Sequence, residues 1–259
     1  MDWLVALGAG LLGLVVGSFL YVVVHRVARN ESVVSPPSSC PRCGSGIRPY
    51  DNVPVLSWLI LRGRCRACSE PISPRYPLVE VGTAIAFAGA GAYVGLDWAL
   101  PAYLYAVAVG VALTMIDLDV HRLPDVIVLP SYVVVAALLV IASWGNGDWG
   151  ALVRAGLGCA ILFGAYFLMM LVYPAGMGPG DVKLAGVLGL LLGWWGWAAL
   201  AVGGFAAFFL GGFYAVGLML TRRAGRKSGI PFGPWMILGA AVGIAAGEQL
   251  GRWYLDLLT

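Results

Sequence analysis

Long apolar stretches separated by short polar joins occupy most of the chain. Each stretch approaches the roughly 20 residues that a helix needs to cross a bilayer. Glycine and proline mark the joins, as at Gly95, Pro101 and Gly193. The pattern predicts eight spans, with seven as the alternative because residues 182–220 can be divided differently. The expected spans are residues 3–24, 78–96, 98–116, 126–143, 151–172, 182–197, 198–220 and 230–250.

One polar segment, residues 26–77, interrupts this pattern with arginines, prolines and four of the five cysteines. We therefore expect three parts: a first span over residues 1–25, the insertion over 26–77, and a membrane domain over 78–259. The predicted fold class is an all-α, polytopic membrane helix bundle of about eight spans that carries one small insertion.

The composition supports a membrane protein. Apolar residues make up 60% of the chain and charged residues only 11%, which leaves too little polar surface for a soluble domain. The 37 glycines suit close contacts between membrane helices. The net charge of +3 is small, so we expect no nucleic-acid partner.

The distribution of the positive charges predicts an orientation. Cytoplasmic segments of membrane proteins are enriched in Lys and Arg. With the N-terminus outside, residues 25–77, 117–125, 173–183 and 221–229 face the cytoplasm, and they hold fourteen of the sixteen Lys and Arg residues. Only Arg154 and Arg252 fall on the other side. The insertion is therefore expected in the cytoplasm, with its basic residues near anionic lipid headgroups of the bilayer.

Four cysteines in the insertion form two C-x-x-C pairs. Their spacing is close to that of a zinc ribbon, in which each pair aims two thiolates at one ion. Gly44, directly after the first pair, suits the tight turn. Two disulfides or four unligated thiols are the alternatives, and a reducing cytoplasm argues against disulfides. The predicted ligands of a structural zinc ion are Cys40, Cys43, Cys65 and Cys68.

Two acidic sites stand at the predicted cytoplasmic ends of spans. Asp117 and Asp119 follow the third span, and Asp181 precedes the sixth. Such acids can be ordinary helix caps, but an ionisable group at a span boundary also indicates function. Glycines at 176, 178 and 180 leave room around Asp181 for another backbone, and Lys183 can hold a nearby negative charge. Two carboxyl groups that share one proton are able to hydrolyse a peptide bond with water.

Several further blocks complete a pattern that resembles the type IV prepilin leader peptidases, which are membrane aspartyl proteases with a GxGD motif. The blocks run in the family's order over nearly the whole chain. They are Gly17-Ser18-Phe19-Leu20 with Val23, His25 and Arg26, the two C-x-x-C pairs around residues 50–58, residues 72–80, the Asp117 and Asp181 blocks, and Pro231-Phe232-Gly233-Pro234.

The resemblance implies that Asp117 and Asp181 are the catalytic pair. Asp117 stands seven residues before Pro124, as the family's first aspartate does, and Asp119 is then a helper. Family members cut prepilin or pseudopilin precursors after a glycine, on the cytoplasmic face of the inner membrane. Many then methylate the new N-terminus with S-adenosylmethionine, and those that carry the insertion tend to have both activities.

The methyl-donor site is not visible as a motif, because no glycine-rich nucleotide loop is present. Glu80, at the start of the second span, is a candidate for binding the substrate amine or the sulfonium, and equally for an acid that stabilises a helix N-terminus. The remaining alternatives are a peptidase without methylase activity, an ion transporter that uses the three aspartates, and a zinc-ribbon adaptor without chemistry.

Overall fold

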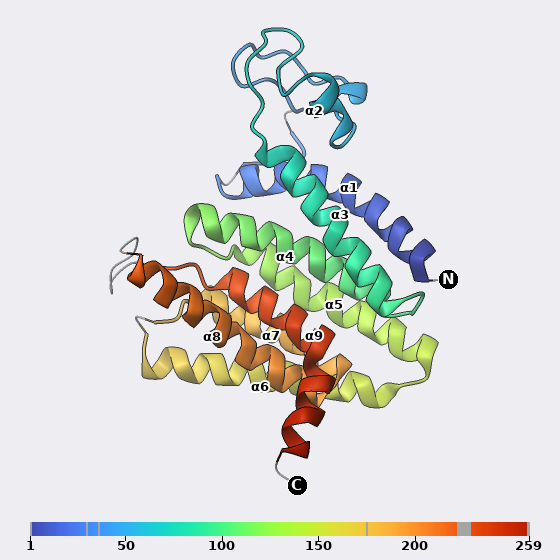
Figure 1. Cartoon of the computed structure of the whole chain (residues 1–259), viewed down its shortest axis with the longest axis vertical. Coiled ribbons are helices and arrows are strands. Elements are labelled where there is room, and N and C mark those ends of the chain that lie inside the picture. Colours follow the sequence, from blue (N-terminus) through green and yellow to red (C-terminus); the bar gives the residue numbers. More distant parts are fainter. Residues whose placement is uncertain (1, 30, 36, 175, 222–228, 258–259) are drawn as a thin grey trace. The chain divides into compact units, whose positions relative to one another are not determined.

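The structure, a computed structural model, describes residues 2–257 except residues 30, 36, 175 and 222–228. All eight expected helices are present, each within six residues of its predicted bounds (Figure 1). A 3₁₀ turn at Pro49–Asp51 and the short helix α2 (Leu56–Ile60) lie in the insertion. The long helices are α1 (Asp2–Val27), α3 (Arg75–Val94), α4 (Leu100–Val120), α5 (Asp125–Asn146), α6 (Trp149–Val172), α7 (Pro179–Trp195), α8 (Trp197–Leu220) and α9 (Gly233–Asp256).

Six of these helices, namely α1, α3, α4, α5, α6 and α8, are long and apolar enough to cross a membrane. This confirms a multi-pass membrane protein with an all-α fold. Of the other two predicted spans, α7 has only 17 residues, and α9 carries Glu248, Arg252 and Asp256 in its second half. The basic run from Arg222 to Lys227 lies outside the described residues, and the orientation of the chain stays a prediction.

The chain divides into two compact units. Unit 1 consists of Met1–Leu100 and Val107–Ala112, and unit 2 of Pro101–Ala106 and Leu113–Thr259. The helix α4 therefore contributes residues to both units. The predicted division at residues 25 and 77 stays a prediction.

In unit 1, α1 and α3 pack closely because small residues on α1 face the backbone of α3. A Cβ atom at Gly13 would lie 2.8 Å from Ala84 Cα, and one at Gly17 would lie 2.8 Å from Glu80 Cα. Any larger residue at either position would push the helices apart. This is the use of glycine that the composition predicts for membrane helices.

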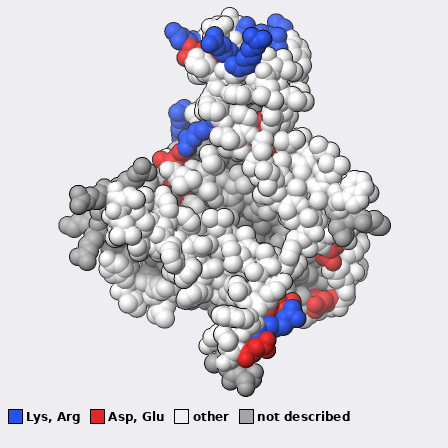
Figure 2. Space-filling view, in the orientation of Figure 1, with Lys and Arg blue, Asp and Glu red and all other residues white. Residues whose placement is uncertain are grey.

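Ion pairs between arginines and carboxylates connect parts of the insertion in unit 1. Arg66 donates three hydrogen bonds to Asp51 Oδ1 and Oδ2, the shortest of 2.6 Å to Oδ1, and lowers the pKa of that carboxyl group. Arg42 pairs with Glu70. Figure 2 shows Lys and Arg side chains gathered over this part of the chain. The insertion is therefore a basic surface module.

Helix α7 is the centre of unit 2, in contact with α5, α6, α8 and α9. Ten of its residues are buried, including Leu184, Leu191 and Leu192. Its contact with α6 is a backbone contact: a Cβ at Gly189 would lie 2.4 Å from the Gly158 carbonyl oxygen. Its short length fits this central place, since its surface meets other helices more than lipid.

Arg154 on α6 caps the C-terminal end of α7. Its guanidinium donates hydrogen bonds of 2.9 Å to the Gly193 carbonyl and 3.0 Å to the Trp194 carbonyl. The last carbonyls of a helix lack partners within the helix, and they carry the negative end of its dipole.

Arg252 is the other basic residue outside the predicted cytoplasmic segments. It pairs with Glu248 one helical turn away. Both positive charges on the predicted outer side therefore have local partners.

Replacing Arg154 by Gln should destabilise unit 2. The two charged hydrogen bonds to the end of α7 would be lost or weakened, which should lower the free energy of unfolding by about 2 kcal/mol. Thermal unfolding in detergent measures this loss. Arg252→Gln is the matched control, because an exposed pair one turn apart contributes less than about 0.5 kcal/mol. Equal effects of the two variants would contradict the capping role.

Candidate active site and candidate metal centre

Asp117 lies near the C-terminal end of α4 and is 5% exposed. Its Oδ2 accepts a hydrogen bond of 3.0 Å from the Gly233 backbone N–H. Gly233 is the first residue of α9, so this N–H is one of the donors that a helix leaves unpaired at its start. The positive end of the α9 dipole therefore faces the Asp117 carboxylate.

Asp181 stands in the first turn of α7, in a similar relation to a helix start. Its Oδ2 accepts a hydrogen bond of 3.1 Å from the backbone N–H of Gly178, the residue that caps α7. The interpretation of Asp181 as a helix cap is therefore correct in part, since its side chain binds a backbone N–H at the start of α7. This hydrogen bond uses Oδ2, so Oδ1 remains available for a proton transfer.

Leu123 connects the surroundings of the two aspartates. A Cβ at Gly180, next to Asp181, would lie 3.0 Å from Leu123 Cβ. A Cβ at Gly233, the donor to Asp117, would lie 3.1 Å from Leu123 Cδ2. Both acids therefore stand beside glycines that pack against Leu123, within unit 2.

Asp119 does not share this environment. It is two residues beyond Asp117 on α4, about 200° around the helix axis, and its side chain is exposed. The two residues therefore differ in burial, and the preference for Asp117 as the first acid stays a prediction.

Lys183 binds Asp125 rather than Asp181. Its Nζ lies 2.8 Å from both carboxylate oxygens of Asp125, the first residue of α5. The Tyr132 hydroxyl, also on α5, donates a hydrogen bond of 2.6 Å to the Lys183 carbonyl. Two contacts from α5 therefore fix the first turns of α7, where Asp181 stands.

The three glycines before Asp181 have different surroundings. Gly178 lets the Asp181 carboxylate approach, since a Cβ there would lie 3.2 Å from Oδ2. Gly180 makes room for Leu123. Gly176 instead lies against the ring of Tyr173, whose Cδ1 would be 2.3 Å from an added Cβ. The expected space around the carboxylate is thus provided by Gly178 and, less directly, by Gly180.

The structure brings the four cysteines of the insertion together. Their Sγ atoms all lie within 4.8 Å of one another, and the Cys40 and Cys68 sulfur atoms are 3.7 Å apart. All four are free thiols, and two disulfides would have required bonded sulfur pairs. Four thiols at this separation match the donor set of a tetrahedral metal site.

The two C-x-x-C turns have the same local geometry. In the first, Gly44 N–H donates to the Cys40 carbonyl and Cys40 N–H to the Ser45 carbonyl, both at 2.9 Å. In the second, Ser69 and Cys65 repeat these bonds, and Ser69 takes the same positive φ as Gly44, 59° against 69°. The expected role of Gly44 in a tight turn is therefore confirmed.

These turns also prepare a thiolate. The backbone N–H groups of Cys43 and Arg42 lower the pKa of the Cys40 thiol to about 6. A backbone N–H at Glu70 acts in the same direction on Cys68, but burial and the neighbouring sulfur atoms outweigh it and raise that pKa to about 12. Four negative thiolates cannot coexist so closely without a cation, so the cluster fits a bound metal ion.

Glu80 is 7% exposed, and its Oε2 accepts a hydrogen bond of 2.7 Å from the Val55 backbone N–H. Val55 has a positive φ of 61°, an unfavourable conformation for a β-branched residue. Glu80 therefore fixes a strained turn of the insertion onto α3. Its role toward a methyl donor stays a prediction.

Sequence reasoning missed Gly233 and Leu123 near the acids. Gly233 stood in a recognised block without an assigned role, although a glycine followed by Pro234 at a helix start indicates exposed N–H donors. No local signal in the sequence pointed to Leu123, because its contacts with Gly180 and Gly233 come from distant helices.

Comparison with known proteins agrees with this site. Residues 11–94 match the Bacterial Peptidase A24 N-terminal domain, and residues 104–216 match the Type IV leader peptidase family. Similar relatives include proteins named prepilin leader peptidase/N-methyltransferase from Aeromonas hydrophila and from Pseudomonas aeruginosa. The first is 36% identical over 98% of this chain and 95% of its own length, and the second 34% identical over 95% and 92%. No solved structure matches the chain.

These matches cover most of the chain and include both of its units. The fold and the site define a multi-pass membrane protein with two aspartates bound at helix starts and a four-cysteine module. The chain belongs to the type IV leader peptidase family.

Replacing Gly233 by Ala should disturb the contact of α9 with Asp117, because the added Cβ would lie 2.9 Å from Asp117 Oδ2. We expect the Gly233 amide to exchange with solvent about ten-fold faster or more, since its hydrogen-bonded acceptor would be displaced. Hydrogen exchange with mass spectrometry of peptides around residue 233 measures this. Gly229→Ala is the control, because a Cβ there meets open space. Unchanged exchange at residue 233 would show that Asp117 adjusts without losing the bond.

Proposed function

We propose that this protein is a membrane aspartyl endopeptidase that removes the leader from prepilin or pseudopilin precursors and N-methylates the new N-terminus. The observation that carries the proposal is the pair formed by the buried Asp117 and the partly buried Asp181, each bound at a helix start within unit 2. Family membership and the names of the relatives support both activities. An ion transporter is less well supported, because transporter sites usually lie near the bilayer midplane.

The aspartate pair suits hydrolysis of a peptide bond by water. One carboxylate takes a proton from water as the oxygen attacks the carbonyl carbon, and the other carboxyl group donates a proton to the carbonyl oxygen. The C–N bond then breaks, and the leaving amine takes up a proton. We assign these two roles to Asp117 and Asp181 as a pair, because two acids that share a proton act as one unit. Asp119 is assigned a supporting role only.

The proposed substrate fits the position of the pair. A leader followed by an apolar helix inserts with its cleavage site at the membrane interface, and both acids stand at ends of apolar helices. We propose that the protein lies in the inner membrane with its N-terminus outside, so that this site faces the cytoplasm. The basic insertion would repel a basic leader, so we assign the insertion to anionic lipid headgroups instead.

We further propose that Cys40, Cys43, Cys65 and Cys68 bind a structural zinc ion. Four thiolates complete a tetrahedral shell and leave no open position for a catalytic water. The methylase activity is assigned to S-adenosylmethionine as methyl donor. When bound, this donor would supply an electrophilic methyl group to the new N-terminal amine.

Replacing either Asp117 or Asp181 by Asn should abolish cleavage while the fold is retained. Asparagine keeps the size of the side chain but cannot accept or supply the catalytic proton, so the rate should fall by about a thousand-fold or more. The assay is cleavage of a peptide with a basic leader and an apolar helix in detergent, with thermal unfolding as the check of folding.

Asp119→Asn is the matched comparison on the same helix end, and its rate should stay within about ten-fold of the wild-type rate. If Asp119→Asn is inactive and Asp117→Asn is active, the first acid is Asp119. If both Asp117→Asn and Asp181→Asn cut like wild type, the aspartates are structural and the peptidase proposal fails.

Zinc should be present at about one ion per chain in the purified protein, as a complete tetrahedral cysteine site requires. Elemental analysis of the protein measures it. Cys43→Ser with Cys68→Ser should remove the metal and make residues 26–77 sensitive to protease, because the insertion has few large buried side chains to hold it. Cys159→Ser is the control, because Cys159 lies on α6 and is not one of the four clustered cysteines. Full zinc content in the double variant would contradict the assignment of these ligands.

A further inference from the structure

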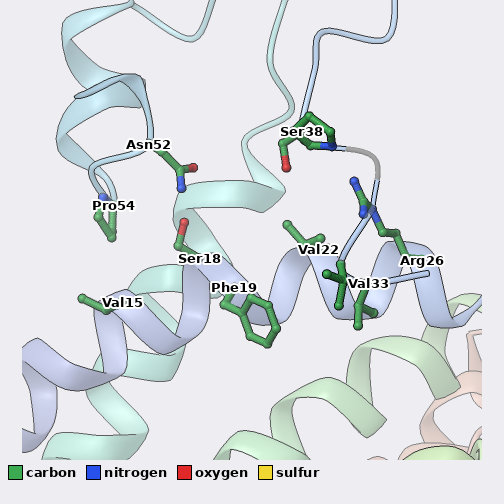
Figure 3. Close-up of a pocket in the computed structure, with 11 residues that line it drawn as sticks. Val15, Ser18, Phe19, Val22, Arg26, Val33, Ser38, Asn52 and Pro54 are labelled. Carbon is green, nitrogen blue, oxygen red and sulfur yellow. The ribbon is translucent and has the colours of Figure 1, made fainter. Parts of the chain in front are cut away.

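Unit 1 contains a pocket between α1 and two loops of the insertion (Figure 3). Its volume is about 340 Å³, which is within the usual range for small-molecule sites. The α1 wall runs from Val15 to Arg26, and the loops contribute Ser38 and Asn52 to the opposite wall. The pocket therefore borders both a membrane helix and the polar insertion.

The α1 wall of the pocket extends beyond the start of α3. The rings of Tyr21 on α1 and Tyr76, in the first turn of α3, are stacked, so residues 22–27 of α1 project past that turn. The 26 residues of α1 extend about 39 Å, which is longer than the hydrocarbon core of about 30 Å. We therefore expect Arg26 to stand at the depth of the lipid headgroups, and Val15 at the depth of the acyl chains.

The pocket continues an apolar stripe on the surface of α1. The stripe recurs every four residues, lies on the other side of α1 from Gly13 and Gly17, which pack against α3, and is more than half exposed. Its members are Leu7, Leu11, Val15 and Phe19. A stripe of this kind on a membrane helix contacts lipid acyl chains. Val15 and Phe19 also line the pocket, so an acyl chain on the stripe leads into it.

The polar groups of the pocket suit an anion. Arg26 donates a hydrogen bond of 2.9 Å to the Ser32 carbonyl, which holds its side chain beside the pocket. About 12 Å away along the helix, Ser18 and Asn52 turn their polar groups toward each other from opposite walls (Figure 3). None of the described residues that line the pocket is Asp or Glu, so an ammonium group would find no negative partner there. The lining therefore fits a ligand with a negative charge, neutral oxygens and an apolar chain.

Glu80 fixes both walls of the pocket without lining it. Its Cα would lie 2.8 Å from a Cβ at Gly17 of α1, and its Oε2 accepts a hydrogen bond of 2.7 Å from the Val55 N–H of the insertion. The buried Ser57 hydroxyl accepts a further hydrogen bond of 3.0 Å from the backbone N–H that follows Asn52. The loop that carries Asn52 is thus held in place before a ligand binds, which reduces the entropy lost on binding.

We propose that this pocket binds an anionic glycerophospholipid whose headgroup has no ammonium group, as in phosphatidylglycerol. The Arg26 guanidinium binds the phosphate through charged hydrogen bonds. Ser18 and Asn52 donate hydrogen bonds to the ester or hydroxyl oxygens, and one acyl chain follows Val15 and Phe19. The inference rests on the proposed assignment of the insertion to anionic headgroups, and it deepens that assignment from a diffuse attraction to one bound lipid.

Native mass spectrometry of the full-length protein in detergent tests this, with equal amounts of dioleoyl-phosphatidylglycerol and dioleoyl-phosphatidylcholine added. We expect wild type to retain one phosphatidylglycerol molecule, in preference to phosphatidylcholine by about ten-fold or more. Arg26→Gln should reduce this retention by about ten-fold, because the charged hydrogen bonds to the phosphate are lost. Arg29→Gln is the matched control, since Arg29 is an exposed arginine just beyond α1 that does not line the pocket.

Two further arms distinguish a lipid from a free phosphate ion. Phe19→Ser should weaken retention of the lipid, because the acyl chain loses an apolar contact. A large excess of inorganic phosphate should leave the lipid bound. Displacement of the lipid by phosphate, together with full retention by Phe19→Ser, would make the pocket a simple anion site and overturn the proposal. Thermal unfolding without added lipid checks that each variant is folded, and Asn52→Ala, in an exposed loop, replaces Arg26→Gln if that variant does not fold.

The outcomes separate the pocket from the proposed function. If Arg29→Gln lowers retention as much as Arg26→Gln, the attraction is diffuse: the pocket proposal fails and the assignment of the insertion to headgroups stands. If wild type shows no preference for phosphatidylglycerol, both fail. If Arg26→Gln retains the lipid but cleaves the leader peptide with a higher KM, the pocket is a substrate site and the lipid proposal is wrong.

Discussion

A carboxylate inside an apolar helix bundle needs hydrogen-bond donors to replace those that water would supply. The packing of the helices in unit 2 depends on how these donors are provided. Asp117 is bound by the first N–H of α9, and Asp181 by the N–H of the residue that caps α7. Helix starts supply such donors and also a positive dipole end. The cost of placing two acids in an apolar helix bundle is thus offset by backbone groups.

This solution requires that two helix starts be held accurately, and the packing of unit 2 provides it. At its N-terminal end α7 is fixed by the Lys183–Asp125 pair and by Tyr132, and at its C-terminal end by Arg154. Its middle lies against α6 without intervening side chains at Gly158 and Gly189. A helix held at both ends and along one side presents Asp181 in one place, which a reaction between two carboxyl groups and a substrate requires.

The sequence predicted the features that have a clear local pattern along the chain. Long apolar stretches located all eight helices, and the two C-x-x-C pairs located the four-thiol cluster. Contacts between residues far apart in the sequence could not be predicted. Nothing near Lys183 identifies Asp125 as its partner, and nothing near Asp117 identifies the Gly233 N–H. Such contacts depend on how the helices pack against one another in three dimensions. The same limit hid the pocket beside Arg26, which two loops complete around α1.

The length of α7 separates the site from the lipid around this enzyme. Seventeen residues extend about 26 Å, a few ångströms less than the average hydrocarbon core. A helix of this length that faced lipid would require the bilayer to thin around it, at a cost that grows with the mismatch. Because α5, α6, α8 and α9 contact α7, the mismatch is absorbed within the bundle. Acyl-chain length should therefore act on the outer helices and leave the hydration of Asp181, in the first turn of α7, largely unchanged.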